Sequence, residues 1–455
     1  MERSSACELV SCIKGHDASK RYAHFDPRVS LDDMAEFVTD PIRVARHGFY
    51  PFIQYEKTIK KYARLGDGTS RKEVREKSRK IAYASHRHRC IYQYYAHLLG
   101  EKYESVIAED RINECVLAYR KLGKSNIHFA KESYDYIKAC GRCFVVVADF
   151  KSFFDTIDHS HLKKMIRLLF EDGRIPDDYY AVLKSLTKYS YCTLSDVLRS
   201  KGFPDSRHGV KKLNSLPRIY EKGEMLANKS IFHKNEEGGG IPQGSPMSGL
   251  LANIFMVEFD RAMLKAAAKD GGIYRRYSDD VLMTASSEKA MRELVETFRR
   301  CVGQTPGLSV EMDKTKAYLF KDGRCYRLVD GPSCSRLWTP GNLTYLGFSF
   351  DGAKVWVRER TTARYHGRMR RSARAAFRLT FPKRRKANVE RFYLGYSPKG
   401  DRPHGDADTS CRKRKLHRNY HSYLRRAKDV FGDSLLDRSQ SHYYRLIRRY
   451  RKGRR

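Results

Sequence analysis

The sequence predicts a mixed fold of the α+β class, in which helices pack against an antiparallel sheet. Three observations support this prediction. The apolar run from Phe144 to Val147 is typical of a buried strand; it ends in Asp149 and is followed by a helix. The Gly-rich stretch "GGGIPQGSP" opens a long helix. Two further apolar runs flank the adjacent residues Asp279 and Asp280, as in a hairpin.

Composition indicates a folded protein with a polyanionic partner. Hydrophobic residues make up 41% of the 455 residues, enough for a sizeable core. The net charge of +37 exceeds what an ordinary solvated surface carries. Nucleic acid is the expected partner, because each neutralised phosphate releases counterions. A membrane surface is the alternative.

Targeting signals and cysteine usage indicate the compartment. No apolar run is long enough to span a bilayer, and "MERSSACELVSCIKGHD" lacks the apolar core of a signal peptide. The eleven cysteines are scattered, as expected for reduced thiols. We therefore predict a cytoplasmic protein. The pair in "CGRC" (Cys140, Cys143) has metal-like spacing, but nothing nearby completes a site, so a structural role is favoured.

Elements in the first part of the chain follow from local pattern. "SRKIAYASHRHRCIYQYYAHLLG" predicts a strand or turn entering an amphipathic helix. "NECVLAYRKLGKSNIHFAKESYDYIKAC" predicts a short strand, a basic Gly-containing loop and a helix. "CFVVVADFKSFFDTIDHSHLKKMIRLLF" supplies the buried strand that ends in Asp149, and its following helix. Residues 190–238 are polar and rich in Gly, Lys and Ser, as in an insertion.

The second part of the chain continues this alternation. Ser245 is predicted to cap the helix after the Gly-rich loop, with Pro246 in its first turn. The hairpin follows, then a helix in "SEKAMRELVETFRRCV" and a strand-like "LTYLGFSFDG". From Arg360 onward there are thirty basic and seven acidic residues, with clusters such as "KRRK", "RKRK" and "RRYRKGRR". Aromatics recur there, and Tyr443, Leu446, Ile447 and Tyr450 predict one apolar helix face, so helices are favoured over a disordered arm.

Paired like charges at a hairpin tip repel each other unless a cation binds there. If the strand ending in Asp149 and the hairpin are neighbours in one sheet, Asp149 and Asp279 converge at one edge. Converging carboxylates suit Mg²⁺, which prefers one or two carboxylates plus phosphate and water. Two such ions can activate an attacking oxygen and stabilise a leaving one in phosphoryl transfer. An Asp-Asp turn without a metal is the alternative.

The motifs together resemble the reverse transcriptase family over roughly residues 75 to 350. "YSDD" resembles its Y-x-D-D motif, "ADFKSFFDTIDH" motif A and "GIPQGSPMSGLLANIF" motif B. "GLSVEMDKTK" resembles motif D, and "YLGFSF" resembles the primer grip. The resemblance implies a right-hand polymerase fold with fingers, palm and a basic helical thumb. It divides the chain into an N-terminal extension with fingers at 1–115, a palm with remaining finger elements and the 190–238 insertion at 116–350, and a thumb or RNA-binding region at 351–455.

The resemblance also implies an RNA-directed DNA polymerase that adds dNTPs to a 3′-hydroxyl with two Mg²⁺ ions. The expected metal ligands are Asp149, the Phe150 carbonyl, Asp279 and, less directly, Asp280. Phe154 would be the steric gate that excludes a ribose 2′-hydroxyl, although a core role is the alternative.

Further roles are implied by the same resemblance. Gln243 and Gly244 would lie against the incoming nucleotide, and Lys314 would protonate the leaving pyrophosphate unless it is only a solvated lysine. Arg79, Lys80 and Arg120 would clamp the triphosphate.

Within the family, "HGFYPFI" and "AYRKLGKSNIHFAKE" resemble bacterial defence-associated enzymes of the "unknown group" class. We find no RNase H, integrase-like or HNH pattern and no VTG motif. This branch implies action against phage beside a structured non-coding RNA, with the RNA template, the DNA product and dNTPs as partners and no membrane. The alternatives are a group II intron-type reverse transcriptase and maturase, or a non-catalytic RNA-binding protein with a decayed polymerase core. The sequence predicts no particular oligomeric state.

Overall fold

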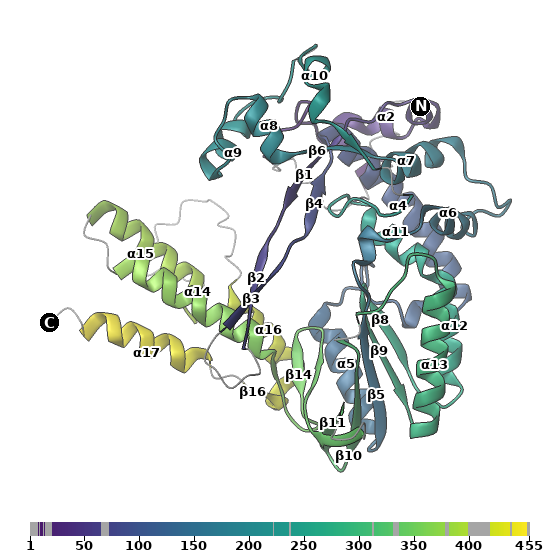
Figure 1. Ribbon diagram of the computed structural model, residues 1–455, viewed down its shortest axis with the longest axis vertical. Helices are drawn as coiled ribbons and strands as arrows, with labels where there is room; N and C mark the ends of the chain where they lie inside the picture. Colours follow the sequence, from purple (N-terminus) through teal and green to yellow (C-terminus); the bar gives the residue numbers. More distant parts are fainter. Residues whose placement is uncertain are drawn as a thin grey trace. The chain divides into compact units, whose positions relative to one another are not determined.

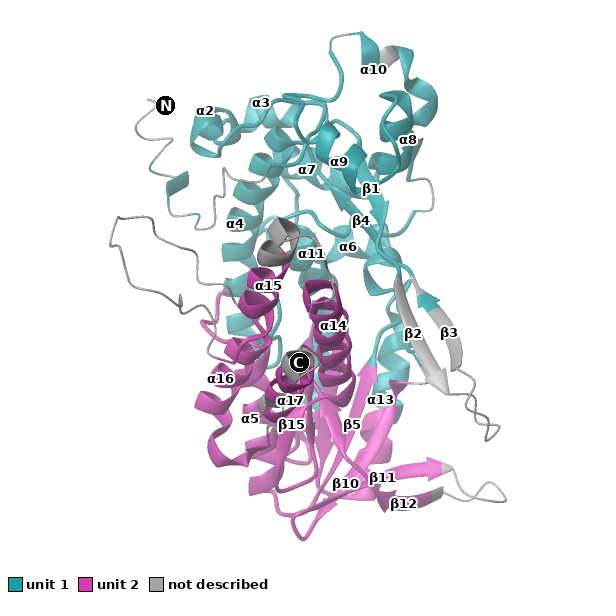
Figure 2. Cartoon of the chain, turned by 90° about the vertical axis from the view of Figure 1, so that its left-hand side faces the viewer, with its two compact units in different colours: residues 1–120, 149–266, 296–311 teal, residues 121–148, 267–295, 312–455 magenta. Residues whose placement is uncertain are grey.

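The computed structural model describes residues 8, 10, 11, 13, 21–64, 72–221, 223–235, 238–311, 314–330, 336–377, 382–398, 419–436 and 439–452. The chain divides into two compact units, each assembled from three segments (Figure 2). Unit 1 comprises residues 1–120, 149–266 and 296–311, and unit 2 comprises residues 121–148, 267–295 and 312–455. Of the described residues, no helix is both long and apolar enough to cross a membrane.

Unit 1 contains a four-stranded sheet with the strand order β4-β1-β6-β7 (Figure 1). These strands are β1 (Phe52–Glu56), β4 (Lys80–Tyr83), β6 (Ser190–Thr193) and β7 (His233–Lys234). β1 is antiparallel to β4 and parallel to β6. A separate two-stranded ribbon consists of β2 (Ile59–Arg64) and β3 (Lys72–Lys77).

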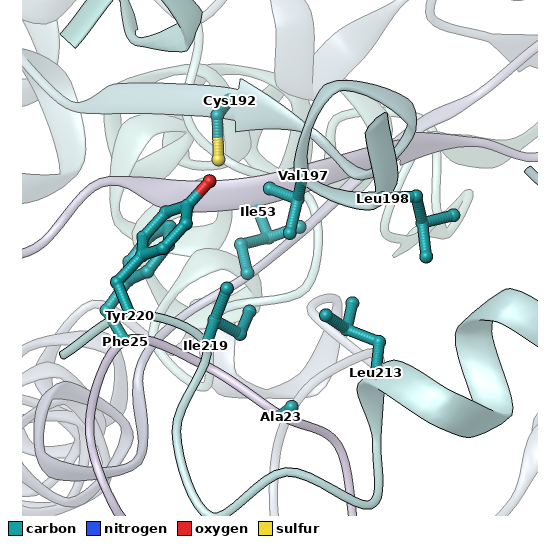
Figure 3. Packing of buried hydrophobic residues seen from close by; sticks show 9 residues of the cluster. All are labelled: Ala23, Phe25, Ile53, Cys192, Val197, Leu198, Leu213, Ile219 and Tyr220. Carbon is teal, nitrogen blue, oxygen red and sulfur yellow. The ribbon is translucent and has the colours of Figure 1, made fainter. Parts of the chain in front are cut away.

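One hydrophobic core of unit 1 joins the N-terminal segment to the 190–238 segment (Figure 3). Phe25 and Ile53 pack there with residues of α8 (Leu194–Ser200) and α9 (Arg207–Leu213), and with Tyr220 stacked on Phe25. The segment also contains the short α10 (Glu224–Ala227). The described residues of the polar stretch predicted as an insertion are therefore folded as part of this unit.

Further helices of unit 1 accompany the long α4 (His86–Glu109). They are α2 (Ala35–Val38), α3 (Pro41–Ala45), α6 (His159–Arg167), α7 (Asp177–Thr187), α11 (Ser248–Phe255) and α12 (Val257–Ala268), whose last two residues belong to unit 2. α4 packs against α7 and α11, and α3 packs against α7. The carboxylate of Asp26 accepts hydrogen bonds from the backbone N–H groups of His86 and Arg87, two donors of the first turn of α4.

Unit 2 is built on a six-stranded sheet with the order β12-β11-β10-β5-β9-β8. The strands are β5 (Cys143–Asp149), β8 (Tyr274–Tyr277), β9 (Asp280–Ala285), β10 (Lys316–Lys321), β11 (Arg324–Asp330) and β12 (Arg336–Pro340). β5 is buried along its apolar run, as a strand covered on both faces must be. Unit 2 also contains α5 (Asn126–Ala139) and the first part of α13 (Glu288–Gln304), which continues into unit 1.

In the C-terminal part of unit 2, the described residues form a second four-stranded sheet and four α-helices. The strands are β13 (Leu343–Tyr345), β14 (Phe348–Phe350), β15 (Val355–Val357) and β16 (Leu435–Leu436). The helices are α14 (Glu359–Phe377), α15 (Pro382–Tyr396), α16 (Tyr420–Phe431) and α17 (Ser439–Lys452). α14, α15 and α17 share a core that includes Tyr365, Met369, Phe392, Tyr443 and Ile447.

Most predicted elements form, including the strand that ends in Asp149, the hairpin and the helical basic region. Of the apolar face predicted for the last helix, Tyr443 and Ile447 are buried and Leu446 packs against the same core, while the side chain of Tyr450 lies outside the described residues. The cluster "RKRK" at 412–415 lies outside the described residues.

Three predictions of local structure were wrong. The short strand expected around Val116 is only a one-residue bridge that follows a 3₁₀ turn at Ile112–Glu114. Ser245 does not cap α11, which begins at Ser248; its hydroxyl accepts instead from the backbone N–H of Met247 in a preceding turn. The strand expected in "LTYLGFSFDG" is two strands, β13 and β14, separated by a turn at Leu346 and Gly347, both with positive φ.

Candidate active site

Asp149 is the last residue of β5, where the chain leaves the six-stranded sheet. Its carbonyl oxygen accepts from the backbone N–H of Glu311 at 2.8 Å, and the N–H of Lys151 donates to Ser309 at 2.9 Å. Between them Phe150 forms a bridge with Val310, and its buried ring stacks on Phe298. These contacts fix the backbone on both sides of Asp149, whose side chain is half-buried.

The hairpin β8–β9 presents Asp279 and Asp280 at a tight turn. Tyr277 pairs with Asp280, which leaves Ser278 and Asp279 as the two turn residues. Ser278 has a φ of 61°, in the left-handed region that non-glycine residues rarely adopt. Such strain persists only where surrounding contacts hold it, and it gathers at functional sites.

The order of strands in the six-stranded sheet places the strands that carry Asp149 and Asp280 next to each other. β5 and β9 are neighbours, so the strand that ends at Asp149 lies beside the strand that begins at Asp280. The expectation that the strand and the hairpin share one sheet is therefore confirmed. The carboxylates of Asp149, Asp279 and Asp280 are each half-buried. Within the described ranges, no group of three or more His, Cys, Asp or Glu side chains is close enough to hold a metal ion.

Tyr345 of β13 is close enough to the Asp280 carboxylate to respond to its charge. Burial raises the pKa of the Tyr345 hydroxyl well above its usual value, and the negative charge of Asp280 raises it further. The phenol is thus protonated at all ordinary pH values. This interaction brings the "YLGFSF" segment and the hairpin into one neighbourhood inside unit 2.

Phe154, Gln243 and Gly244 lie together in unit 1. The carbonyl of Phe154 accepts from the N–H of Ile241 at 2.9 Å, two residues before Gln243. The carbonyl of Gln243 accepts from the N–H of Ala82 in β4 at 2.8 Å. Gly244 has a φ of 130°, and a Cβ there would lie 2.4 Å from the carbonyl oxygen of Ala82, so only glycine fits.

The three arginine and lysine residues predicted to clamp a triphosphate differ in their surroundings. Arg79 and Lys80 are exposed; the backbone of Arg79 pairs with Lys57, and Lys80 begins β4. The guanidinium of Arg120 is instead occupied: it binds both carboxylate oxygens of Glu104 at 2.8 and 2.6 Å and donates to two backbone carbonyls. With its side chain only 5% exposed, Arg120 supports the local backbone, and we do not retain it as a triphosphate ligand.

Lys314 is half-buried and lies two residues before the start of β10. Its neighbours Met312 and Asp313 in the motif lie outside the described residues.

Tyr119 was missed by the sequence analysis. It has a φ of 61° and is 54% exposed, and its ring meets that of Phe154 edge-to-face with centroids 6.2 Å apart. A lone tyrosine in a basic loop gives no periodic signal, so the pattern around it could not have revealed its position.

Comparison with known proteins identifies the family. A family model for reverse transcriptase (RNA-dependent DNA polymerase) matches residues 72–350, a stretch that includes Asp149, Asp279 and Asp280. The match covers more than half of the chain, and the chain therefore belongs to the reverse transcriptase family. This confirms the family inferred from the motifs. Reverse transcriptase domains generally use divalent metal ions.

Similar solved structures include three structures of telomerase from two Candida species. For apo telomerase from Candida tropicalis truncated from the C-terminal domain, the TM-score is 0.40 at 12% identity, over 66% of this chain and 54% of that one. For apo telomerase from Candida tropicalis, the TM-score is 0.39 at 12% identity, over 76% of this chain and 54% of that one. For telomerase from Candida albicans in complex with a TWJ fragment of telomeric RNA, the TM-score is 0.38 at 10% identity, over 91% of this chain and 61% of that one. The chain spans about half the length of the first two. No curated protein sequence matches it significantly.

Proposed function

We propose that this protein is an RNA-directed DNA polymerase that adds dNTPs to a 3′-hydroxyl. The observation that carries the proposal is the neighbouring position of β5, which ends at Asp149, and β9, which begins at Asp280 behind a strained turn. This arrangement lies inside the region matched by the reverse transcriptase family model.

The donor set at these strand ends suits a hard divalent cation. Carboxylate oxygens are the ligands that Mg²⁺ prefers, and half-buried carboxylates keep room for water and phosphate. Asp149, Asp279 and Asp280, with the backbone carbonyl of Phe150, would hold two Mg²⁺ ions. Such ions supply charge neutralisation for the attacking 3′-oxygen and the leaving pyrophosphate.

The other predicted residues would position and select the nucleotide. Phe154 would exclude a ribose 2′-hydroxyl by its bulk, because a ring cannot share that space with an oxygen. Gln243 and Gly244 would lie along the bound nucleotide, and the exposed Arg79 and Lys80 would neutralise its phosphates. Lys314 would donate a proton to the pyrophosphate oxygen as it leaves.

Substitution of the paired aspartates tests the proposal. The double variant Asp279→Asn, Asp280→Asn should abolish primer extension with Mg²⁺ while keeping RNA binding, because the carboxylates serve the metal rather than the fold. Asp322→Asn is a matched control, since Asp322 also lies in a two-residue hairpin turn with positive φ, between β10 and β11. Full activity in the double variant, with a normal far-UV spectrum, would exclude the catalytic assignment.

The biological role that we propose is defence against phage beside a structured non-coding RNA. It is supported by the resemblance of "HGFYPFI" and "AYRKLGKSNIHFAKE" to defence-associated enzymes, and by the thirty basic residues from Arg360 onward. We assign residues 1–115 to an N-terminal extension and fingers, 116–350 to the palm and 351–455 to a thumb. RNA co-purified with the protein should be one dedicated transcript; intron sequences would instead indicate a group II-type maturase, and RNA binding without primer extension a non-catalytic protein.

A further inference from the structure

Tyr119 adopts a costly backbone conformation. A non-glycine residue with positive φ costs about 1–3 kcal/mol. Here the residue with this conformation, at a φ of 61°, remains 54% exposed, so its burial offsets little of the cost. Strain combined with exposure is expected where a side chain is presented to a ligand.

Two polar side chains hold the backbone on either side of Tyr119. The fully buried Asn253, in α11, donates from Nδ2 to the carbonyl of Ala118 at 2.8 Å. Arg120 donates from Nη1 to the carbonyl of Val116 at 2.8 Å, and its guanidinium is itself held by Glu104. These bonds supply the support that the strained conformation needs. The role of Arg120 is therefore to hold the backbone next to Tyr119.

The ring of Tyr119 lies between helix α11 and Phe154. At Gly249 of α11, a Cβ would come within 2.6 Å of the Cγ and Cδ1 atoms of Tyr119, so the ring occupies the space that any other residue would fill. On its other side the ring meets Phe154 at an interplanar angle of 84°, an arrangement that stabilises aromatic pairs by about 0.5–1.5 kcal/mol. The ring of Tyr119 thus contacts both Phe154 and α11, the helix that contains the end of the "GIPQGSPMSGLLANIF" motif.

We propose that Tyr119 is a specificity-determining residue, which holds the ring of Phe154 against the sugar of the incoming nucleotide and completes an aromatic wall there. The ligand class is a deoxynucleoside triphosphate, so this inference rests on the proposed polymerase function. A phenylalanine free to rotate away would leave room for a 2′-hydroxyl. Tyr119 removes that freedom through its ring, and the hydroxyl group is not needed.

The test is the ratio of kcat/KM for a dNTP over the matching rNTP, measured on one template–primer with Mg²⁺. Tyr119→Ala should lower this ratio about tenfold, whereas Tyr119→Phe should keep it within about twofold, because the ring is retained. Gly249→Ala should lower it as well, since its Cβ displaces the same ring. Tyr180→Ala is the control, because Tyr180 is also an exposed tyrosine of unit 1, on α7.

The effects of substituting Phe154 and Tyr119 should not be additive. Phe154→Ala should lower the ratio by itself, and adding Tyr119→Ala should lower it no further, because the second residue acts through the first. An unchanged ratio in both Tyr119→Ala and Gly249→Ala, with activity retained, would overturn the inference alone. Absence of dNTP incorporation by the unmodified protein would overturn the proposed function, and this inference with it. If Tyr119→Ala does not fold, the ratio measured for Gly249→Ala tests the inference in its place.

Discussion

The guanidinium Nη1 of Arg276 donates a hydrogen bond to the backbone carbonyl of Ser278 at 3.3 Å. Arg276 is fully buried, so the bond runs from the interior of unit 2 to the turn that carries Asp279. Burying a guanidinium is expensive, and it is tolerated where the group binds well-placed partners. Arg276 therefore supports the strained backbone of Ser278 from beneath.

Replacing Arg276 should reduce catalysis more than binding. Arg276→Met removes the donor to Ser278 while keeping an unbranched side chain, and a hydrogen bond from a charged group contributes about 1.5–3 kcal/mol. We expect kcat for primer extension to fall about tenfold or more, with KM for dNTP little changed. Arg276→Lys should recover part of the loss, since it keeps the charge but not the planar fork.

The control for Arg276 is Arg292→Met, an exposed arginine on α13 of the same unit. It should leave kcat unchanged. Equal kcat in Arg276→Met and the unmodified protein would show that the turn does not depend on this bond.

Gly244→Ala should disrupt the contact between the Gly-rich loop and β4. The new Cβ would lie 2.4 Å from the carbonyl oxygen of Ala82, at a φ of 130° that alanine does not tolerate. The loop must therefore move away from β4, and we expect primer extension to fall by at least tenfold.

Gly173→Ala separates backbone strain from that steric clash. Gly173 has a φ of 65° with no atom within 4 Å of an added Cβ. This variant should lower the melting temperature slightly and leave activity intact. If both glycine variants were fully active, the position of the loop would not matter for nucleotide addition.

Acid should destabilise unit 1 through its buried histidines. Burial, together with the charge of the nearby His86, lowers the pKa of His24 from 6.5 to about 3. Since the unfolded chain takes up a proton near pH 6.5 and the folded chain does not, stability is complete above that pH and is lost as pH falls from 6.5 towards 3. His24 alone should cost about 2 kcal/mol between pH 7.5 and pH 5, on the basis of about 1.4 kcal/mol per pKa unit.

Denaturant titrations of the free energy of unfolding across this pH range provide the measurement. His24→Gln should flatten the dependence on pH, whereas His208→Gln, an exposed histidine on α9, should not. A free energy of unfolding that stays constant between pH 7.5 and pH 5 would contradict the buried, neutral state of His24.

One face of α14 should bind nucleic-acid phosphates. Its apolar face, with Tyr365, Met369 and Ala373, is buried, while Arg364, Arg368 and Arg371 are exposed. Each phosphate contact contributes about 0.7–0.9 to the slope of log affinity against log salt. Replacing all three arginines with glutamine should therefore flatten the slope of template–primer binding by about 2 to 3 units.

A charge-matched variant controls for net charge. Arg292, Arg299 and Arg300 are exposed on α13, and replacing them with glutamine removes the same charge from another helix. The slope of log affinity against log salt for this triple variant should stay near that of the unmodified protein. An equal effect of both triple variants would mean that overall charge, rather than the face of α14, attracts the nucleic acid.

The sequence by itself determined the family and most of the elements. The apolar run before Asp149 and the alternation around Asp279 and Asp280 are local signals, because burial and turn geometry constrain neighbouring residues in the chain. The five motifs were visible for the same reason. The assignments of Phe154 and Gly244 remain predictions that the experiments above address, and those of Gln243 and Lys314 remain predictions as well.

Only the tertiary structure decided which partners each side chain meets. Arg120 appeared to be a phosphate ligand, but Glu104 and two carbonyls occupy its guanidinium. Tyr119 had no signal at all, since its role depends on Gly249 and Phe154, which are far from it in the chain. The physical reason is that periodicity reports how a segment is buried, whereas hydrogen bonds and ring contacts depend on segments brought together only by folding.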